Sequence, residues 1–246
     1  MAVANAGTNK EGEDIAQPLP RSWTLKALKG GTPGITLYGM KISPPCCKLR
    51  FMLNYYNIPF TCVDGKKQDS DYTKVPVLDI GDRQINDSFI IVKNLAPILQ
   101  GRKLSDRDLK LEQKLTFEIM VALERDCASS VRDLCGCASL AGGFMGCALA
   151  SASPIIACCV GPKMGREKNL LTLEEYNAYM VHELGGKAFF GGSQPTVIDV
   201  SIFGVLMPFE SAGNSCLQAL LGGEDTPFRK WYEGMYKHAS QVTSIF

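Results

Sequence analysis

The chain has 246 residues, enough for one large or two small domains with a substantial hydrophobic core. Hydrophobic residues make up 46% and charged residues 21%, an ordinary globular composition. The 26 basic residues nearly balance the 25 acidic ones, and the net charge of +1 therefore gives no electrostatic indication of nucleic-acid binding.

Residues 1–34 read as an N-terminal arm that is polar as far as Arg21. The arm has neither the apolar core of a secretory signal nor the arginine-rich, acid-poor bias of a transit peptide. Residues 26–33 are a lead-in that contains glycine and proline. Two interpretations remain open: an ordered arm that lies on a partner or on its own domain, or a disordered tail.

A short buried strand is expected at Ile35–Tyr38, because three of its four residues are apolar and the fourth is β-branched. A helix then opens at Pro44, since the fixed φ of proline suits a first helical turn. An apolar stripe at helical spacing follows in Leu49, Met52, Leu53 and Tyr56.

Three more strands and a helix complete this region as far as residue 100. The strands are expected at residues 60–63, at Val75–Ile80 and from Arg83. Asp87 or Ser88 then caps a helix with an apolar core face. The predicted order is β-α-β followed by β-β-α.

This order, with a Val-Pro before a strand, resembles the thioredoxin fold of the glutathione transferases. The resemblance implies that the Val75–Pro76 bond is cis and that the Val75 main chain pairs with a peptide-like ligand. It also implies that Asp87 and Ser88, at a helix N-terminus, hold the γ-glutamyl carboxylate of glutathione. The alternative is that Pro76 marks an ordinary loop and Asp87-Ser88 is only a helix cap.

The fold class is therefore expected to be an α/β thioredoxin-like N-terminal domain, residues 35–100, followed by an all-α C-terminal domain, residues 109–246. Residues 101–108 form a polar linker whose Ser105 resembles a helix start. Further along, Thr172 and Glu175 form a capping box.

A second Thr-x-x-Asp motif, Thr196 to Asp199, resembles the buried capping box of glutathione transferases. In such a box the Thr196 hydroxyl accepts from the residue-199 N–H, and Asp199 accepts from the Thr196 N–H. Near the end of the chain, an amphipathic helix is expected to bury Trp231.

The stretch from Leu134 to Pro162 has no charged residue and is built mainly of glycine, alanine, serine and cysteine. Small residues recur every fourth position, which allows close helix contact, at Ala138, Gly142, Gly146 and Ala150. Either a buried hairpin of the helical domain or a membrane-contacting segment fits this composition.

Ten cysteines occur in the chain, but they include no Cys-x-x-Cys, and both histidines, His182 and His238, are remote from the cysteine pairs in sequence. The sequence therefore lacks a zinc motif and predicts no metal site. Mostly buried, reduced cysteines in a reducing compartment are expected.

Several local matches, among them Lys48, resemble the membrane-associated prostaglandin E synthase type 2 family over residues 35 to about 235. That family binds glutathione, has been associated with haem, and isomerises a prostaglandin endoperoxide. Its nucleophile opens a Cys-Pro-x-Cys loop, whereas this chain has Ser43 there and Cys46 at the second cysteine. No motif places either histidine as a haem ligand.

Two classes of function remain open. One is a glutathione-dependent transferase or isomerase with Tyr38, Ser43 and Cys46 around the sulfur. The other is a catalytically weak or silent module, with glutathione as a ligand, that serves as an accessory subunit of a larger membrane-associated assembly. The resemblance suggests an organellar membrane, such as the mitochondrial one, although no transit peptide is visible.

Overall fold

The structure is a computed structural model that describes residues 10, 13–41, 43–126, 170–211 and 215–240. The stretch from Leu134 to Pro162, and with it the predicted small-residue contact, lies outside the described residues. Among the helices in the described ranges, none combines the length and the apolar character that a membrane crossing needs.

The first half of the chain forms a four-stranded sheet in the order β2-β1-β3-β4. The strands are β1 (Ile35–Tyr38), β2 (Thr61–Val63), β3 (Val77–Ile80) and β4 (Arg83–Asn86). β1 runs parallel to β2 and antiparallel to β3, which is antiparallel to β4. With α2 (Pro44–Tyr55) after β1 and α3 (Ser88–Gln100) after β4, the predicted order of elements is confirmed.

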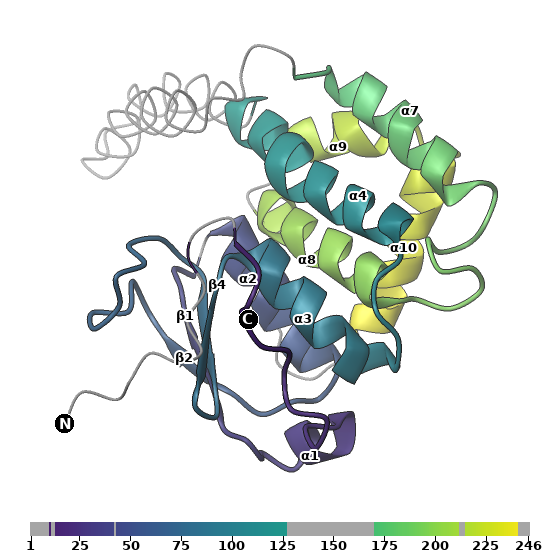
Figure 1. The fold of residues 1–246 in the computed structure, drawn as a ribbon. Helices are drawn as coiled ribbons and strands as arrows, with labels where there is room; N and C mark the ends of the chain where they lie inside the picture. The colour runs from purple at the N-terminus through teal and green to yellow at the C-terminus, as the bar shows by residue number, and fades with distance from the viewer. Residues whose placement is uncertain (1–9, 11–12, 42, 127–169, 212–214, 241–246) are drawn as a thin grey trace, which may run out of the picture.

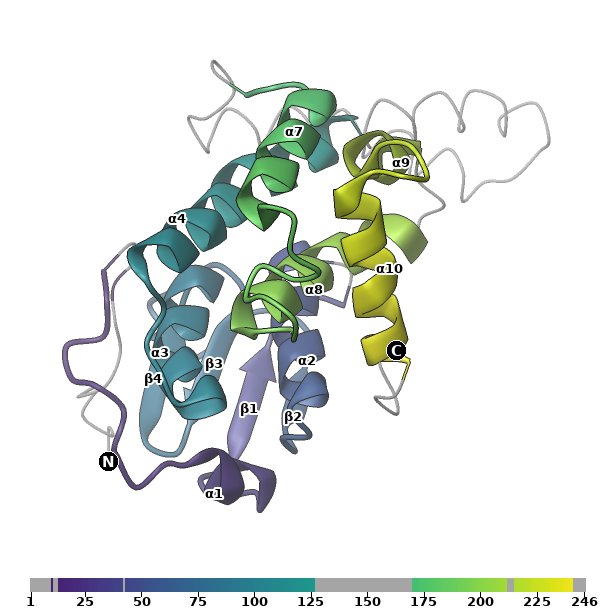
Figure 2. The same cartoon turned by 90° about the vertical axis from the view of Figure 1, so that its right-hand side faces the viewer.

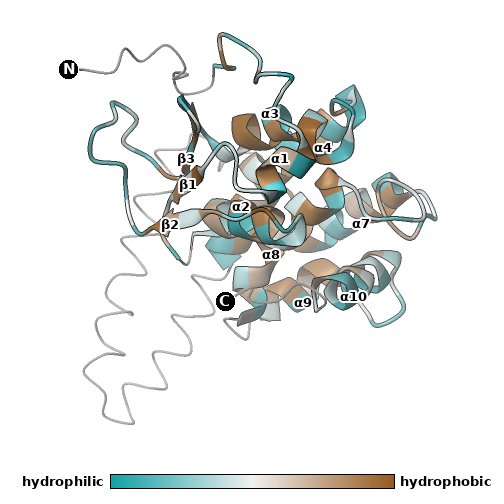
Figure 3. Cartoon of the chain, turned by 90° about the horizontal axis from the view of Figure 1, so that it is seen from below, coloured by the Kyte–Doolittle hydropathy of each residue, from teal (hydrophilic) through white to brown (hydrophobic). Residues whose placement is uncertain are grey.

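One face of this sheet is covered by α2 and α3 (Figure 1). Leu37, Leu78 and Ile85 point into this covered face and are fully buried. The apolar stripe of α2 packs against them, and in Figure 3 the strands β1 and β3 are correspondingly brown. β3 begins two residues later than predicted, at Val77, because Pro76 has no N–H to donate to a strand ladder.

A short helix that the sequence does not predict precedes the sheet. α1 (Leu25–Lys29) overlaps the first half of the lead-in expected at residues 26–33, and the Thr24 side chain caps it by accepting from the Ala27 N–H. Leu28 is fully buried, and its burial together with the Thr24 cap stabilises the helix. A helix this short shows no hydrophobic periodicity in the sequence.

The second half of the described chain is helical (Figure 2). It contains α4 (Asp106–Lys114), continued by the π-helical turn η1 (Leu115–Ile119), then α7 (Leu173–Leu184), α8 (Val197–Ser211), α9 (Ser215–Leu221) and α10 (Pro227–Ala239). The predicted start at Ser105 and the predicted box at Thr172 are both confirmed as capping boxes. The fold is thus a thioredoxin-like α/β part followed by a helical part.

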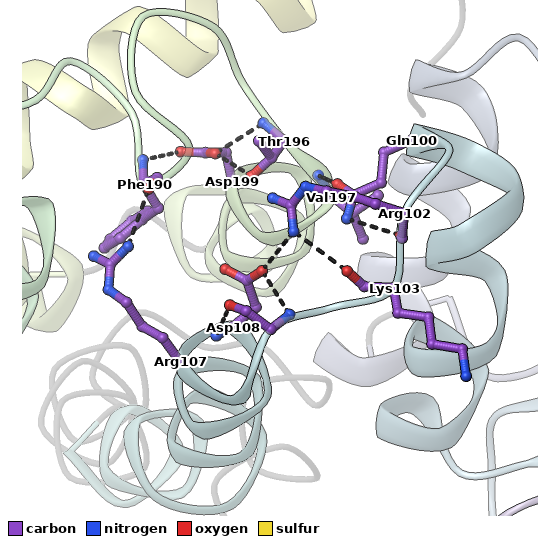
Figure 4. A network of polar contacts seen from close by, with 10 residues as sticks. Gln100, Arg102, Lys103, Arg107, Asp108, Phe190, Thr196, Val197 and Asp199 are labelled. Atoms are coloured by element: carbon purple, nitrogen blue, oxygen red, sulfur yellow. Dashed lines mark hydrogen bonds and ion pairs between the residues drawn. The ribbon is translucent and has the colours of Figure 1, made fainter.

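Asp199 is a fully buried carboxylate at the start of α8. Its Oδ1 accepts from the Phe190 N–H and the Trp231 indole N–H, each at 2.8 Å. Its Oδ2 accepts from the Thr196 N–H at 2.8 Å, as predicted. The Thr196 hydroxyl, predicted to accept from the residue-199 N–H, instead donates to the carboxylate at 2.8 Å, because a buried charge is stabilised by every donor within reach (Figure 4).

α2 and α8 cross in close contact, and a buried polar network lies at their crossing. A Cβ on Gly204 of α8 would come within 2.9 Å of the Lys48 Cα of α2, so only glycine allows this approach. The Lys48 ammonium lies 2.5 Å from Glu112 Oε1 and donates to the Thr116 hydroxyl at 3.1 Å. Glu112 Oε2 accepts from the Ser201 hydroxyl at 2.6 Å.

Residues 13–24 of the arm lie on the chain's own first domain, one of the two interpretations that the sequence leaves open. Asp14 pairs with Lys93 of α3 at 2.5 Å and accepts from the Asn94 amide at 2.8 Å. Partial burial disfavours the charged form of Asp14, but these hydrogen bonds outweigh it and hold its pKa below the ordinary value. Ile15 and Trp23 pack against the core.

Replacing Lys48 by methionine is expected to lower the free energy of unfolding by roughly 3–5 kcal/mol, because Glu112 would stay buried without its counter-charge. Urea denaturation followed by circular dichroism measures the change. The matched control is Lys230→Met, since the Lys230 and Asp225 side chains are 61% and 100% exposed and their ion pair contributes little. An equal loss in both variants would contradict the importance of the buried pair.

Candidate functional site

The strand register brings the candidate residues to one end of the sheet. Tyr38, the last residue of β1, pairs with Val77, the first of β3, and Val77 pairs with Asn86, the last of β4. The loop after β1, the segment before β3 and the turn after β4 therefore leave the sheet at the same end. The turn into α2 at Ser43, the Val75–Pro76 dipeptide and the Asp87–Ser88 pair meet there.

Val75 presents an unused main chain at this end. The Val75–Pro76 peptide bond is cis, as predicted. Within the described residues, neither the N–H nor the C=O of Val75 makes a hydrogen bond, although the residue is half-buried. A donor and an acceptor on one residue match the pairing needs of a peptide-like ligand.

The N-terminus of α3 offers a second set of free groups. Asp87 caps the helix, since its side chain accepts from the Phe89 N–H at 2.8 Å and the Ile90 N–H at 3.4 Å. Its φ of 73° is unusual for a residue other than glycine and is typical of functional turns. Asp87, and not Ser88, is thus the cap that the sequence left undecided between the two.

Ser88 is the first residue of α3 and is only 3% exposed. In the part of the chain that the structure describes, its N–H and its hydroxyl make no hydrogen bond. Buried polar groups are nearly always paired, so an unpaired pair of donors at a helix N-terminus fits a carboxylate ligand. The expected anion-binding role therefore falls on Ser88 more than on Asp87, whose carboxylate is used by the cap.

Ser43 and Cys46 lie together at the N-terminus of α2. Ser43 is the N-cap, but its side chain makes no capping hydrogen bond. Cys46, the third residue of α2, is 1% exposed, and its sulfur lies so close to Gly39 that a Cβ there would come within 2.5 Å. Burial raises the pKa of the Cys46 thiol, and hydrogen bonds from Ser43 and the Met40 main chain offset this only in part.

Cys47 is the neighbouring thiol and is half-buried. Its sulfur donates to the Lys41 carbonyl at 3.1 Å and accepts from the Arg50 guanidinium at 3.0 Å. Burial raises the pKa of Cys47 as well, although the Arg50 charge opposes the shift. Neither thiol at this helix N-terminus is therefore favoured as a thiolate at neutral pH.

Tyr38 lies on the other face of the sheet from α2. It alternates with the buried Leu37, and its ring is covered by the Lys67 ammonium at 5.5 Å from the centroid. Burial, together with the negative charge of Asp79, raises the pKa of Tyr38, which keeps the phenol protonated. The structure thus brings Ser43 and Cys46 together, but points Tyr38 to the opposite face.

Sequence reasoning missed four polar residues on that opposite face: Lys67, Asp79, Gln84 and Asn86. Gln84 and Asn86 alternate with Ile85 in β4, and this period-two pattern was the available signal. Lys67 lies in a loop and carries no signal of its own.

The two histidines lie on different helices, His182 on α7 and His238 on α10. His182 is exposed on α7, and His238 packs edge-on against Phe189. Among the described residues, no group of histidine, cysteine, aspartate and glutamate side chains is arranged to hold a metal ion.

Comparisons with known proteins agree with this fold. Residues 37–102 match the model of the glutathione S-transferase N-terminal domain. The glutathione S-transferase of Xanthobacter autotrophicus has a TM-score of 0.50 at 18% identity, over 82% of this chain and 92% of that one. A glutathione S-transferase of Pseudomonas fluorescens has a TM-score of 0.51 at 15% identity, over 86% and 98%.

A third structure, glutathione S-transferase-I bound with lactoylglutathione, has a TM-score of 0.50 at 15% identity, over 87% of this chain and all of that one. These identities establish the fold alone. The chain therefore has a glutathione-transferase-like fold, with a thioredoxin-like domain in its first half.

Among curated proteins, prostaglandin E synthase 2 of Danio rerio is 34% identical in a match 88 residues long, and this match covers 33% of this chain. The match spans only 22% of the Danio rerio protein. This similarity agrees with the expected likeness to prostaglandin E synthase type 2.

Changing Ser43 to cysteine is expected to place a partly exposed thiol at the helix N-terminus, with a lowered pKa. Alkylation by iodoacetamide at pH 7, followed peptide by peptide by mass spectrometry, should be about tenfold faster at residue 43 than at Cys46, because the reacting species is the thiolate. The exposed Cys62 serves as the internal control. Equal rates at residues 43 and 46 would contradict the prediction.

Proposed function

We propose that the chain binds glutathione across the end of the sheet and is a catalytically weak or silent module. The Val75 main chain would pair with the peptide, and the N-terminus of α3 at Ser88 would bind the γ-glutamyl carboxylate. The glutathione sulfur would then face Ser43. The glutathione conjugate bound by a protein of the same fold supports this choice of ligand.

The proposal of weak or absent catalysis rests on the residues at the N-terminus of α2. The first position is Ser43, and Cys46 is buried with a raised pKa. A helix N-terminus stabilises a nearby anion by about 1 kcal/mol, which is far too little to ionise a serine hydroxyl. Dithiol chemistry thus lacks its nucleophile at this position.

The alternative is an active glutathione-dependent transferase or a prostaglandin-endoperoxide isomerase. One observation favours it: the Ser43 hydroxyl makes no capping bond to the α2 main chain, and a glutathione thiolate could replace the Cys46 thiol as its acceptor. Conjugation of glutathione to 1-chloro-2,4-dinitrobenzene separates the two readings. Turnover above the uncatalysed rate that falls in Ser43→Ala supports the enzyme, and no turnover supports the silent module.

Replacing Ser88 by alanine is expected to weaken glutathione binding about tenfold or more, because a hydrogen bond to a charged carboxylate contributes roughly 1.5–3 kcal/mol. Isothermal titration calorimetry measures the dissociation constant. Ser22→Ala is the matched control, since Ser22 is exposed and lies on the arm. Unchanged affinity in Ser88→Ala would remove the carboxylate site, and no binding by the wild type would reject the proposed ligand.

We further propose that the module is an accessory subunit of a membrane-associated complex, in mitochondria or another organelle. The charge-free stretch from Leu134 to Pro162 supports membrane or partner contact, since its small residues recur at helical spacing.

After extraction of native membranes with a mild detergent, the protein is expected to migrate on a native gel in an assembly much larger than its own 26.8 kDa. Gly146→Leu would place a large side chain in the proposed helix contact and should release the protein from that assembly. Recovery of the wild type from the soluble fraction as a single chain would contradict the accessory role.

A further inference from the structure

The loop of residues 64–74 lies on the side of the sheet away from α2 and α3 (Figure 1). It begins directly after β2 and leads directly into Val75 and Pro76. The main chain that is proposed to pair with glutathione is therefore the end of this loop. What holds the loop against the sheet also determines where Val75 lies.

An ion pair fixes the first part of the loop. The Lys67 ammonium lies 2.9 Å and 2.7 Å from the two carboxylate oxygens of Asp79, in the middle of β3. The two side chains are only 13% and 25% exposed, so the pair is partly shielded from water and salt. The same ammonium lies over the Tyr38 ring of β1, so Lys67 contacts two strands.

A hydrogen-bonded chain fixes the second part. The Gln84 amide of β4 donates to the Ser70 hydroxyl at 2.7 Å and to Asn86 Oδ1 at 2.9 Å. Ser70 also accepts from the Tyr72 N–H at 3.1 Å, and Tyr72 is 9% exposed. Asn86 is 1% exposed and directly precedes Asp87 and Ser88.

These contacts connect the two halves of the candidate site. Lys67 and Ser70 hold the loop that ends at Val75, and the Gln84 amide joins Ser70 to the residue before the α3 turn. We propose that Lys67 is a positioning residue which, with the Ser70–Gln84–Asn86 chain, sets the separation between the Val75 main chain and the Ser88 end of the site. This inference rests on the proposed binding of glutathione.

The physical reason is preorganisation. A tripeptide that contacts both Val75 and the α3 N-terminus binds tightly only when the two are already at the right distance, because ordering a loop on binding costs free energy. Lys67 itself touches no ligand in this scheme. Its contribution acts through the loop main chain.

The test is glutathione affinity by isothermal titration calorimetry together with amide hydrogen exchange of residues 64–78. Lys67→Ala should speed exchange in this segment and weaken glutathione binding about tenfold, because the loop must then be ordered by the ligand. The exchanged pair Lys67→Asp with Asp79→Lys, and the conservative Lys67→Arg, should restore much of both. Lys93→Ala removes a more exposed ion pair, between α3 and Asp14 of the arm, and should leave the affinity unchanged.

The outcomes are distinguishable. Faster exchange in Lys67→Ala with unchanged affinity would overturn the positioning role and leave the proposed function standing. No binding by the wild type would overturn both. If Lys67→Ala fails to fold, Ser70→Ala decides, since it breaks the Gln84 contact without touching an ion pair: weaker binding supports the proposal, and unchanged binding overturns it.

Discussion

The buried pair of Lys48 and Glu112 is the constraint on which the arrangement of the two halves depends. Two charges removed from water are tolerated only where each is hydrogen-bonded as well as paired. The additional partners are Thr116, whose hydroxyl accepts from the Lys48 ammonium, and Ser201, whose hydroxyl donates to Glu112 Oε2. The helices α2, α4 and α8 and the turn η1 are therefore held at a fixed separation that hydrophobic contact alone would specify less sharply.

This constraint reaches the candidate site because Lys48 and Cys46 belong to the same turn of α2. The helix that presents Ser43 is packed along α8 with no room for a Cβ at Gly204. At the first residue of α8, the Gln100 side chain of α3 accepts from the Val197 N–H at 3.3 Å (Figure 4). Both helices that begin at the site are thus in contact with α8, and the site is built on rigid elements.

Much of the fold could be predicted because its signals are local. Proline at the start of α2 and the box at Ser105 each specify a helix start within a few residues. The burial of Lys48 could not be predicted, since its partner Glu112 lies 64 positions away and a lone lysine in a helix reads as solvent-exposed. Likewise, Asp79 in an apolar strand gains its meaning only when the sheet places it beneath Lys67.

The candidate site was predictable to a similar degree. The order of the motifs along the chain predicts the binding residues Val75, Pro76, Asp87 and Ser88. The strand register brings these residues to one end of the sheet. The transferase hypothesis places Tyr38 with Ser43 and Cys46 around the sulfur, but the two-residue alternation of β1 turns Tyr38 to the opposite face. Residues that are close in sequence need not share a face of the sheet, because the pleat of a strand turns successive side chains to opposite faces.

The arm also bears on the outer strands of the sheet. β4 is the last strand of the sheet, and an outer strand with free peptide groups invites pairing with a strand of another molecule. Arg83 of β4 donates to Gln17 of the arm at 3.2 Å, while Ile15 and Trp23 attach the same segment to the core. The opposite border, β2, spans only Thr61–Val63. The arm thus contacts one border of the sheet at Arg83, and the other border is a strand of only three residues, so the length of edge open to pairing with another molecule is limited on both sides.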